Sequence, residues 1–498
     1  MNVNPITRLD YPDPDVIRVE DTYYMVSTTM HFMPGCEILQ SFDLVHWEHV
    51  TYVYETLDHT DAQQLKSGQN IYGQGMWAAS LRYHEGRFYI CFVANDTRKT
   101  YLYTSEKIDG PWKKQLIEGF YHDGSLLFDE DGRNYIVYGN DEIWITELNE
   151  DLTAPKKDGL HRLLVSDHKN PELGYEGSHI QKINGYYYIF LVHSLRDRWM
   201  RTEACFYSDS LEGEFTGGDV LCDDRGYCGQ GVAQGGIVDT PDGKWYAMLF
   251  QDSGAVGRIP ILLPVTWKDH FPFFGQNGHV PEEIEVHSTR PGYIYQPLVG
   301  SDDFCNGLLP RWQFNHDPDP RYYHLDALQG TYTITTREVC TELTQAVNTL
   351  TQRMSYPSCA AEVTVDASAL KEGDVAGLCA FQGCYAAVGI TKHHGKYEVL
   401  MLDKKEDGIL DMTEGTVVES HQMDFRLEAD FCNMKDEARC YYRVNKGDWL
   451  PIGTVHKLYF KLDHFTGCRF GLFCYAAEET GGSACFRDFK YYDVDEIS

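Results

Sequence analysis

The sequence lacks long apolar runs and is poor in basic residues. No stretch of about 18 apolar residues occurs in the 498-residue chain, which excludes an ordinary membrane-spanning helix. Lysine and arginine total 43 against 75 aspartate and glutamate residues, giving a formal net charge of −32. Such a surface repels phosphate backbones and anionic membranes, so we expect neither nucleic acid nor membrane as a partner. A neutral ligand suits this charge, although solubility alone is a sufficient explanation for it.

A leader segment and a cysteine motif are also missing. Residues 1–5 contain no basic region followed by an apolar core, so we expect a cytoplasmic protein. The 15 cysteines are odd in number and scattered, and no C-x-x-C motif has a matching partner. This pattern supports neither a zinc site nor a disulfide framework, and it favours reduced thiols. We therefore assign no metal-ligating residues.

Aromatic residues and glycine, by contrast, are abundant. Aromatics make up 13% of the chain, with 34 tyrosines, and 44 residues are glycine, a mixture typical of turn-rich, all-β proteins. The chain is too long for one ordinary domain. Residues 1–296 repeat a strand–turn–strand pattern, whereas residues 297–498 alternate short strands without that repeat and suggest a β-sandwich. Because no low-complexity linker separates the halves, we expect the two domains to pack on each other.

Five similar hairpins organise residues 1–296. Each joins an apolar run to an aromatic run through a turn rich in Asp, Asn or Gly. The similar segments are residues 20–24, 85–89, 131–135, 184–188 and 241–246. Their tyrosines are 65, 46, 53 and 58 residues apart, which matches four-stranded blades with loop insertions. We predict a five-bladed β-propeller; hairpins in a sandwich are the alternative.

One position in these repeats carries a residue typical of a functional site. It lies 11 or 12 residues before the last tyrosine of each hairpin. The five occupants are Asp13, Trp77, Asp123, Glu176 and Gln234. Because the innermost strand of a blade lines the central channel, these side chains are expected to converge at the channel mouth. A sandwich of hairpins gives no reason for this shared register, which favours the propeller.

Three convergent carboxylates beside an aromatic wall suggest acid/base chemistry on a sugar. Cleavage of a glycosidic bond needs one acid to protonate the leaving oxygen and one carboxylate to activate water or attack the anomeric carbon. Burial and neighbouring negative charge raise the pKa of one group, and hydrogen bonds keep the other low. Glu has the longer reach, so we assign Glu176 as the acid, Asp13 as the base and Asp123 as the tuning group. Turn capping is the alternative for any one of them.

Other residues are candidates for substrate binding. Gln234 can bind a sugar hydroxyl or hold water. Trp77 offers an apolar face to a pyranose ring, with packing as the alternative. His31 and Phe32 follow the first hairpin and are expected at the pocket rim. Arg258 follows the fifth hairpin, where it can bind sugar hydroxyls and lower the pKa of the base, with a surface salt bridge as the alternative.

The segments that hold these residues resemble glycoside hydrolase family 43. The similar stretches are residues 11–18, 76–79, 122–126 and 175–179. The resemblance implies a five-bladed propeller with Asp13 as general base, Asp123 as pKa modulator and orienter, and Glu176 as general acid. It also implies inversion of the anomeric configuration in a single step. Arg258 matches a substrate-contacting arginine of the β-xylosidase branch.

The resemblance continues into the second half of the chain. Residues 302–315 and 350–353 look like the C-terminal, concanavalin-like β-sandwich of the β-xylosidase branch, which lends a loop to the active-site pocket. Such a pocket is closed at one end, which implies exo action. The implied activity is release of xylose from the non-reducing ends of β-1,4-xylo-oligosaccharides, with terminal α-L-arabinofuranose as a second substrate. The alternatives are an α-L-arabinofuranosidase and a non-catalytic carbohydrate-binding propeller.

The resemblance also bears on cofactors and partners. Many relatives have a histidine that holds a central calcium or its waters where this chain has Gln234. We therefore expect no required cofactor and regard a structural calcium as doubtful. The expected partner is a neutral oligosaccharide, and the sequence leaves the oligomeric state open, a homo-oligomer included.

Overall fold

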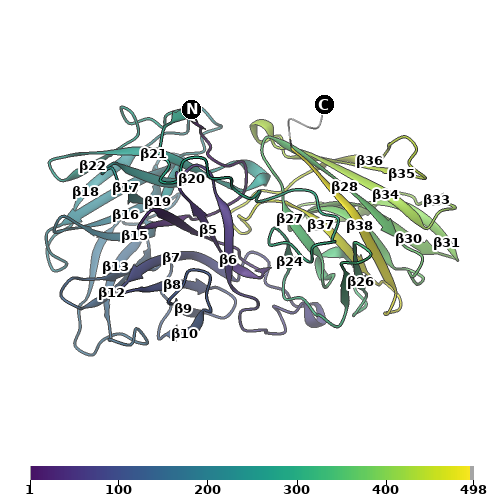
Figure 1. The fold of residues 1–498 in the computed structure, drawn as a ribbon, viewed down its shortest axis with the longest axis horizontal. Helices are drawn as coiled ribbons and strands as arrows, with labels where there is room; N and C mark the ends of the chain where they lie inside the picture. Colours follow the sequence, from purple (N-terminus) through teal and green to yellow (C-terminus); the bar gives the residue numbers. More distant parts are fainter. Residues whose placement is uncertain (1, 494–498) are drawn as a thin grey trace.

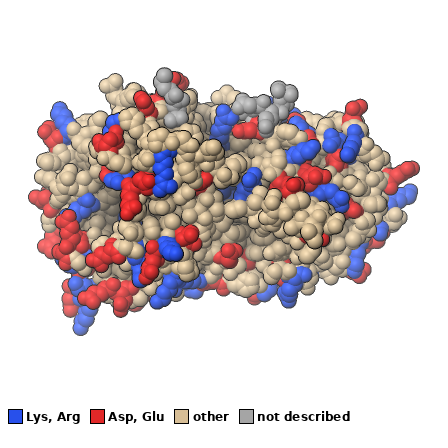
Figure 2. Space-filling model, viewed as in Figure 1, with Lys and Arg blue, Asp and Glu red and all other residues tan. Residues whose placement is uncertain are grey.

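The computed structural model describes residues 2–493, which form two β-rich domains side by side. Figure 1 shows the N-terminal half, purple to teal, as one body and the C-terminal half, green to yellow, as the other. No helix among the described residues is long and apolar enough to cross a membrane. All 15 cysteines are unpaired. On the face drawn in Figure 2, acidic and basic side chains are interspersed over both domains.

The N-terminal domain consists of five four-stranded antiparallel sheets, so the predicted propeller is confirmed. Blade 1 contains β2 (Asp15–Val19), β3 (Thr22–Ser27), β5 (Gly35–Ser41) and β6 (Glu48–Tyr54). Blade 2 contains β7 (Met76–His84), β8 (Arg87–Ala94), β9 (Lys99–Ser105) and β10 (Lys113–Ile117). Blade 3 contains β11 (Ser125–Phe128), β12 (Asn134–Asn140), β13 (Glu142–Leu148) and β14 (His161–Ser166).

The last two blades follow the same order along the chain. Blade 4 contains β15 (Glu176–Ile183), β16 (Tyr186–Ser194), β17 (Arg201–Ser208) and β18 (Thr216–Leu221). Blade 5 contains β19 (Ala233–Asp239), β20 (Trp245–Asp252), β21 (Arg258–Lys268) and β22 (Phe271–Phe274). A two-stranded sheet pairs β1 (Asn2–Val3) with β23 (Glu283–Ile284) beside this blade. Short 3-10 helices lie at η1 (Lys66–Gly68) and η2 (Gly254–Val256).

Turn chemistry explains the hairpins that open the blades. Asn184 and Gly185, between β15 and β16, both have positive φ angles, 51° and 85°. Two successive left-handed residues make the turn whose twist matches the flanking strands, and Asn-Gly tolerates it best. Apolar side chains from adjoining blades, such as Ile145 and Ile189, pack into one cluster. Local turns therefore form each hairpin, and burial between blades stacks them around the axis.

The C-terminal domain is a sandwich of two antiparallel sheets, as predicted. The first sheet has the strand order β32-β31-β30-β29-β37-β27-β24-β4, where β4 (Phe32–Met33) comes from the propeller, and β33 also pairs with β31. The second sheet has the order β25-β26-β38-β28-β34-β35-β36. The first contains β24 (Gln313–Asn315), β27 (Leu350–Arg353), β29 (Val375–Phe381), β30 (Tyr385–His393), β31 (Lys396–Lys404), β32 (Leu410–Met412), β33 (Thr416–Val418) and β37 (Arg469–Tyr475). The second contains β25 (Tyr323–Asp326), β26 (Thr331–Thr335), β28 (Ser358–Asp366), β34 (Gln422–Asp430), β35 (Glu437–Arg443), β36 (Leu450–Lys457) and β38 (Ser483–Asp493). Helices η3 (Leu343–Gln345) and η4 (Cys432–Met434) complete the domain.

A strand from the propeller completes one sheet of the sandwich. β4 (Phe32–Met33) leaves blade 1 and pairs with β24 at the sheet edge. Beside it, Arg353 Nη1 forms a buried ion pair with Glu37 Oε2 at 2.8 Å, and Arg353 Nε donates to the Asp10 carbonyl at 2.8 Å. The two domains are therefore joined by backbone pairing as well as by buried charge. The predicted boundary at 296/297 falls between β23 and β24, where the described structure has no strand.

Candidate active site

The innermost strands of the propeller begin with a repeated backbone geometry. Asp13, Asp123 and Gln234 all have left-handed backbones, with φ angles of 52°, 47° and 65°. Each lies two residues before a position that pairs with the second strand of its blade; these positions are Asp15, Ser125 and Gly236. Left-handed geometry is uncommon for residues other than glycine and often marks functional sites.

The fourth blade departs from the register that the sequence predicted. β15 has a register shift between Glu176 and His179, as β19 has between Ala233 and Gly236. Within the β15 shift Gly177, with φ 65°, occupies the left-handed position that Gln234 occupies in β19, and Glu176 lies one residue earlier. Counting back from a tyrosine could not detect this offset, because the turn between β15 and β16 has two residues, whereas five residues separate the corresponding strands of blades 3 and 5. The predicted equivalence of Glu176 with Asp13, Asp123 and Gln234 is therefore wrong by one residue.

Gly177 allows Glu176 to enter the site from this displaced position. A Cβ on Gly177 would lie 2.7 Å from Cγ of Gln234, so no larger residue fits without movement. The Gly177 N–H donates to Asp123 Oδ2 at 2.9 Å. Glycine tolerates both the positive φ and the close approach of neighbours. Gly177 thus lies directly between the Asp123 and Gln234 side chains.

Asp13 is buried and fixed through both carboxylate oxygens. Only 3% of the residue is exposed. Arg258 Nη1 donates to Oδ1 at 2.6 Å, and Thr28 Oγ1 donates to Oδ2 at 2.6 Å. Charge-assisted hydrogen bonds of this length fix orientation as well as position. Asp13 is therefore a rigidly held carboxylate.

Arg258 is a buried bridge and not a surface salt bridge. Its Nε donates to Asp252 Oδ1 at 3.2 Å while Nη1 binds Asp13. Arg201 Nε donates to the other oxygen of Asp252 at 3.1 Å. The Arg258 guanidinium also lies 3.8 Å from the ring centre of Phe465. The planar, permanently charged guanidinium suits such a stacked and forked site.

Glu176 lies against a different set of partners, His122 and Asn140. Asn140 Nδ2 donates to Oε2 at 2.8 Å, and His122 Nε2 lies 3.4 Å from the same oxygen. Burial raises the pKa of Glu176. The hydrogen bond and charge of His122, with the charges of Arg201 and Arg258, outweigh burial and lower that pKa below its usual value. This differs from the raised pKa expected for an acid, because the sequence argument did not include His122.

Asp123 and His122 complete this acidic corner. Burial raises the pKa of Asp123 to about 6; the charge of His122 opposes the rise, and the charges of Glu176 and Asp13 add to it. Burial lowers the pKa of His122, but Asp123, Glu176 and Asp13 together raise it to about 9. In the sequence His122 belongs to the segment 122–126, and its position next to Asp123 is the one signal there for a role in the site.

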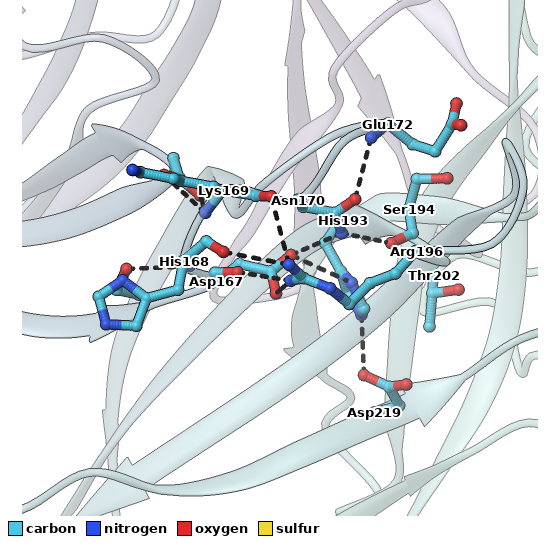
Figure 3. A network of polar contacts seen from close by, with 12 residues as sticks. Asp167, His168, Lys169, Asn170, Glu172, His193, Ser194, Arg196, Thr202 and Asp219 are labelled. Atoms are coloured by element: carbon cyan, nitrogen blue, oxygen red, sulfur yellow. Dashed lines mark hydrogen bonds and ion pairs between the residues drawn. The ribbon is translucent and has the colours of Figure 1, made fainter.

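The segment that leads to Glu176 is anchored by a polar network, drawn in Figure 3. Arg196 Nη1 donates to Asp167 Oδ1 at 3.0 Å, and His193 Nε2 lies 2.8 Å from Asp219 Oδ1. Ser194 N donates to the Leu173 carbonyl at 3.0 Å. These contacts attach residues 167–173 to blade 4, which limits the freedom of the chain just before Glu176.

The aromatic wall of the site comes from both domains. Trp77 and Phe465 lie edge to face with ring centres 5.4 Å apart, and Trp77 lies 6.0 Å from His122. Phe465 belongs to a sandwich loop, which is held on the propeller where Gly467 N donates to Asp10 Oδ2 at 2.7 Å. The resemblance implied such a loop, but nothing in the sequence identified Phe465.

Gln234 lies beside a buried glutamate. Its N–H donates to Glu203 Oε2 at 2.7 Å, and its own side-chain Oε1 is buried with no hydrogen-bond partner in the described structure. Burial raises the pKa of Glu203 well above its usual value. The unpaired Gln234 oxygen fits the predicted binding of a hydroxyl or water, which remains a prediction.

The donor groups do not fit a calcium ion. Within the described chain, one group of potential ligands has its atoms within 4.8 Å of one another: His122, Asp123 and Glu176. Calcium takes six to eight oxygen ligands, and this group offers a ring nitrogen with two carboxylates. The inner strands already carry a positive charge, the Arg82 guanidinium, which donates to Asp15 Oδ2 at 2.8 Å and to Ser125 Oγ at 2.6 Å. This charge disfavours a second cation beside it.

His31 and Phe32 do not lie at a pocket rim, which corrects their expected location. They are 0% and 1% exposed. The His31 ring packs against Phe32, His316, His464 and Tyr72, at centroid distances between 4.3 and 5.2 Å. The Arg469 guanidinium lies 3.5 Å from the Phe32 ring centre. The strand exchange at β4 draws both residues into the domain interface.

Comparisons with known proteins agree with this architecture. Residues 3–272 match the model for glycosyl hydrolases family 43, and residues 301–492 match the beta xylosidase C-terminal concanavalin A-like domain. A beta-xylosidase of Formosa agariphila is 27% identical over 99% of this chain and 89% of that protein. A xylosidase/arabinosidase of Butyrivibrio fibrisolvens is 24% identical over 99% of each protein.

A solved structure resembles the whole chain. It is described as a bifunctional GH43-CE protein of Bacteroides eggerthii, 42% identical, with a TM-score of 0.91. The match covers 100% of this chain and 64% of that one, so this chain spans about two thirds of that protein's length. The family model covers more than half of the sequence and its segments hold the clustered carboxylates. The chain therefore belongs to glycosyl hydrolases family 43, with a concanavalin A-like sandwich as its C-terminal domain.

Proposed function

We propose that this glycoside hydrolase releases xylose from the non-reducing ends of β-1,4-xylo-oligosaccharides with inversion of configuration, and also releases terminal α-L-arabinofuranose. In this proposal Asp13 is the general base, Glu176 the general acid and Asp123 the group that orients Glu176 and tunes its pKa. The observation that carries it is the contrast between two carboxylates at one channel mouth, of which Asp13 is buried and Glu176 partly exposed. Asp13 is held by Arg258 and Thr28, whereas Glu176 is held by His122 and Asn140.

The proposed reaction is a single displacement. Asp13 takes a proton from a water molecule, whose oxygen attacks the anomeric carbon. Glu176 gives a proton to the glycosidic oxygen as the bond to the leaving sugar breaks. Inverting enzymes use one acid and one base on opposite faces of the sugar ring, with room for water beside the base. Asp123 favours this arrangement because it accepts the Gly177 N–H and so fixes the backbone next to Glu176.

The aromatic wall supports exo action on one terminal sugar. Trp77 and Phe465 bring apolar surface from two domains to the same side of the site. Arg258 packs under Phe465 and binds Asp13, so the sandwich loop also covers the base. From this two-domain wall we infer that the site is closed at one end, which favours a chain end over an internal linkage. The described side chains supply every group that the proposed steps need.

An α-L-arabinofuranosidase is the second candidate for the main activity. The Butyrivibrio fibrisolvens relative carries both names in its description, xylosidase and arabinosidase. Terminal D-xylose and L-arabinofuranose present similar hydroxyls to a pocket. Gln234, with its unpaired buried oxygen, is the candidate residue for discriminating between them.

A pair of kinetic assays tests the proposal. Turnover of an aryl β-D-xyloside is compared with that of an aryl α-L-arabinofuranoside, and proton NMR of the first product gives its anomeric configuration. We expect higher kcat/KM on the xyloside and an inverted product. Higher kcat/KM on the arabinofuranoside would select the second candidate, and a retained product would contradict the mechanism. Binding without turnover of either substrate would point to a carbohydrate-binding propeller.

A further inference from the structure

His122 lies between the two carboxylates of the acidic corner. Its Nε2 is 3.4 Å from Glu176 Oε2 and 3.6 Å from Asp123 Oδ2. The side chain is 20% exposed and its ring meets the edge of Trp77. One ring nitrogen thus faces two acids and can exchange a proton with either of them. A side chain that only filled space here would need no titratable nitrogen.

The charges around His122 favour its protonated form. Three carboxylates raise the pKa of His122 to about 9, against the effect of burial: Asp123, Glu176 and Asp13. The positive charges of Arg201 and Arg258 help to keep Glu176 ionised. Before substrate binds, the corner therefore holds an imidazolium beside a glutamate that lacks the proton an acid must deliver. A source for that proton is needed.

We propose that His122 is a positioning residue that stores the catalytic proton and supplies it to Glu176. The proposal rests on the assignment of Glu176 as general acid. Hydrogen bonds of catalytic groups are often long in the free enzyme and tighten in the complex, so a separation of 3.4 Å between Nε2 and Oε2 is compatible with transfer on binding.

The step balances with the groups present. The proton on His122 Nε2 passes to the Glu176 carboxylate and leaves a neutral imidazole. Glu176 then gives the same proton to the glycosidic oxygen as that oxygen takes the electron pair of the breaking bond. Asp13 receives one proton from the attacking water, and the hydroxide that remains forms a bond to the anomeric carbon. Exchange with solvent returns a proton to His122 and removes one from Asp13.

Asn140 gives the arrangement its fixed geometry. Its Nδ2 donates to the same oxygen, Oε2, that faces His122. An amide cannot titrate in this range, so Asn140 holds Glu176 in place whether or not His122 carries its proton. Asn140 therefore orients Glu176, and His122 supplies its proton.

An NMR titration tests the pairing without measuring activity. The ring signal of His122 is assigned by its loss in His122→Gln and followed with pH in the wild type and in Glu176→Gln. We expect a midpoint near pH 9 in the wild type and a fall of about one unit or more in Glu176→Gln, since one carboxylate charge is lost. An unchanged midpoint in Glu176→Gln would overturn the proposal.

Kinetics then separate proton supply from packing. On xylobiose, a poor leaving group, His122→Gln should move the basic limb of kcat/KM to lower pH and reduce the rate about 10-fold or more at neutral pH. An activated aryl xyloside needs less protonation and should lose less. His324→Gln is the matched control, because His324 is an exposed residue of the sandwich.

Equal losses on both substrates with an unmoved basic limb would reduce His122 to a structural role. Failure of the wild type to cleave either substrate would instead refute the proposed function, and the NMR result would still decide the pairing.

Discussion

The two walls of the site hold their carboxylates with different kinds of cation. Asp13 is bound by Arg258, whose charge is permanent, whereas Glu176 lies beside His122, whose charge can be lost at alkaline pH. A base must keep the same protonation state until water arrives, and an acid must gain and lose a proton in each turnover. The difference teaches that, in the proposed mechanism, this propeller distinguishes acid from base through the neighbour of each carboxylate.

The largest expected effect is the loss of turnover when either carboxylate, Asp13 or Glu176, is replaced by its amide. Asp13→Asn should lower kcat about 10³-fold or more on xylobiose and on an activated aryl xyloside, because both need an activated water. Glu176→Gln should cause a similar loss on xylobiose and a smaller one on the aryl xyloside. Steady-state kinetics on the two substrates measure this. Near-normal turnover of xylobiose by Asp13→Asn would show that the base has been misassigned.

A smaller loss of kcat/KM is expected when Arg258, the permanent cation beside Asp13, is replaced by lysine. Arg258→Lys keeps a charge but loses the fork that binds Asp13 and Asp252 together, so kcat/KM should fall roughly 10²-fold. Arg290→Lys, at an exposed arginine paired with Asp21, is the control and should leave kcat/KM unchanged. A fully active Arg258→Lys would mean that charge alone, without the fork, holds the base.

A smaller effect is expected on stability. The folded-state pKa of Asp123 is raised to about 6 from an ordinary 3.8, so the fold disfavours its ionised form and loses stability as pH rises through this range. Asp123→Asn should therefore gain about 1–3 kcal/mol relative to wild type at pH 8 and nothing at pH 3.5, while losing activity. Urea unfolding at both pH values measures it. A gain of equal size at both would exclude the linkage.

The smallest expected effect is that of metal removal. Arg82 already supplies a positive charge inside the channel, through its bonds to Asp15 and Ser125. EDTA followed by added calcium should change neither Tm nor kcat by more than measurement error. A calcium-dependent rise in Tm would show that both walls depend on an ion in addition to their side-chain cations.

The sequence by itself determined the architecture and indicated which three carboxylates are candidates for the site. Asn-Gly and Asp-Gly turns between alternating runs specify hairpins because few residues accept the required positive φ angles. Repetition of such hairpins five times specifies a closed propeller with inner strands that converge on one axis. Asp13, Asp123 and Glu176 were selected as candidates from this repeat, although the count placed Glu176 one residue out of register. Period counting measures spacing along the chain, and the short turn between β15 and β16 changes that spacing relative to blades 3 and 5.

Only the tertiary structure decided which neighbours surround those acids. Phe465 meets Trp77 from more than 300 positions away, and no local pattern encodes such a contact. The repeat placed Arg258 near the base, but only folding showed that it bridges Asp13 and Asp252. His31 and Phe32 were expected at a rim, but the exchange of β4 into the sandwich buries them. The proposed role of His122 in supplying a proton follows only from the folded structure, in which its Nε2 lies 3.4 Å from Glu176 Oε2. Turn and strand preferences act over a few residues, whereas pKa values and pocket walls depend on distances that folding alone sets.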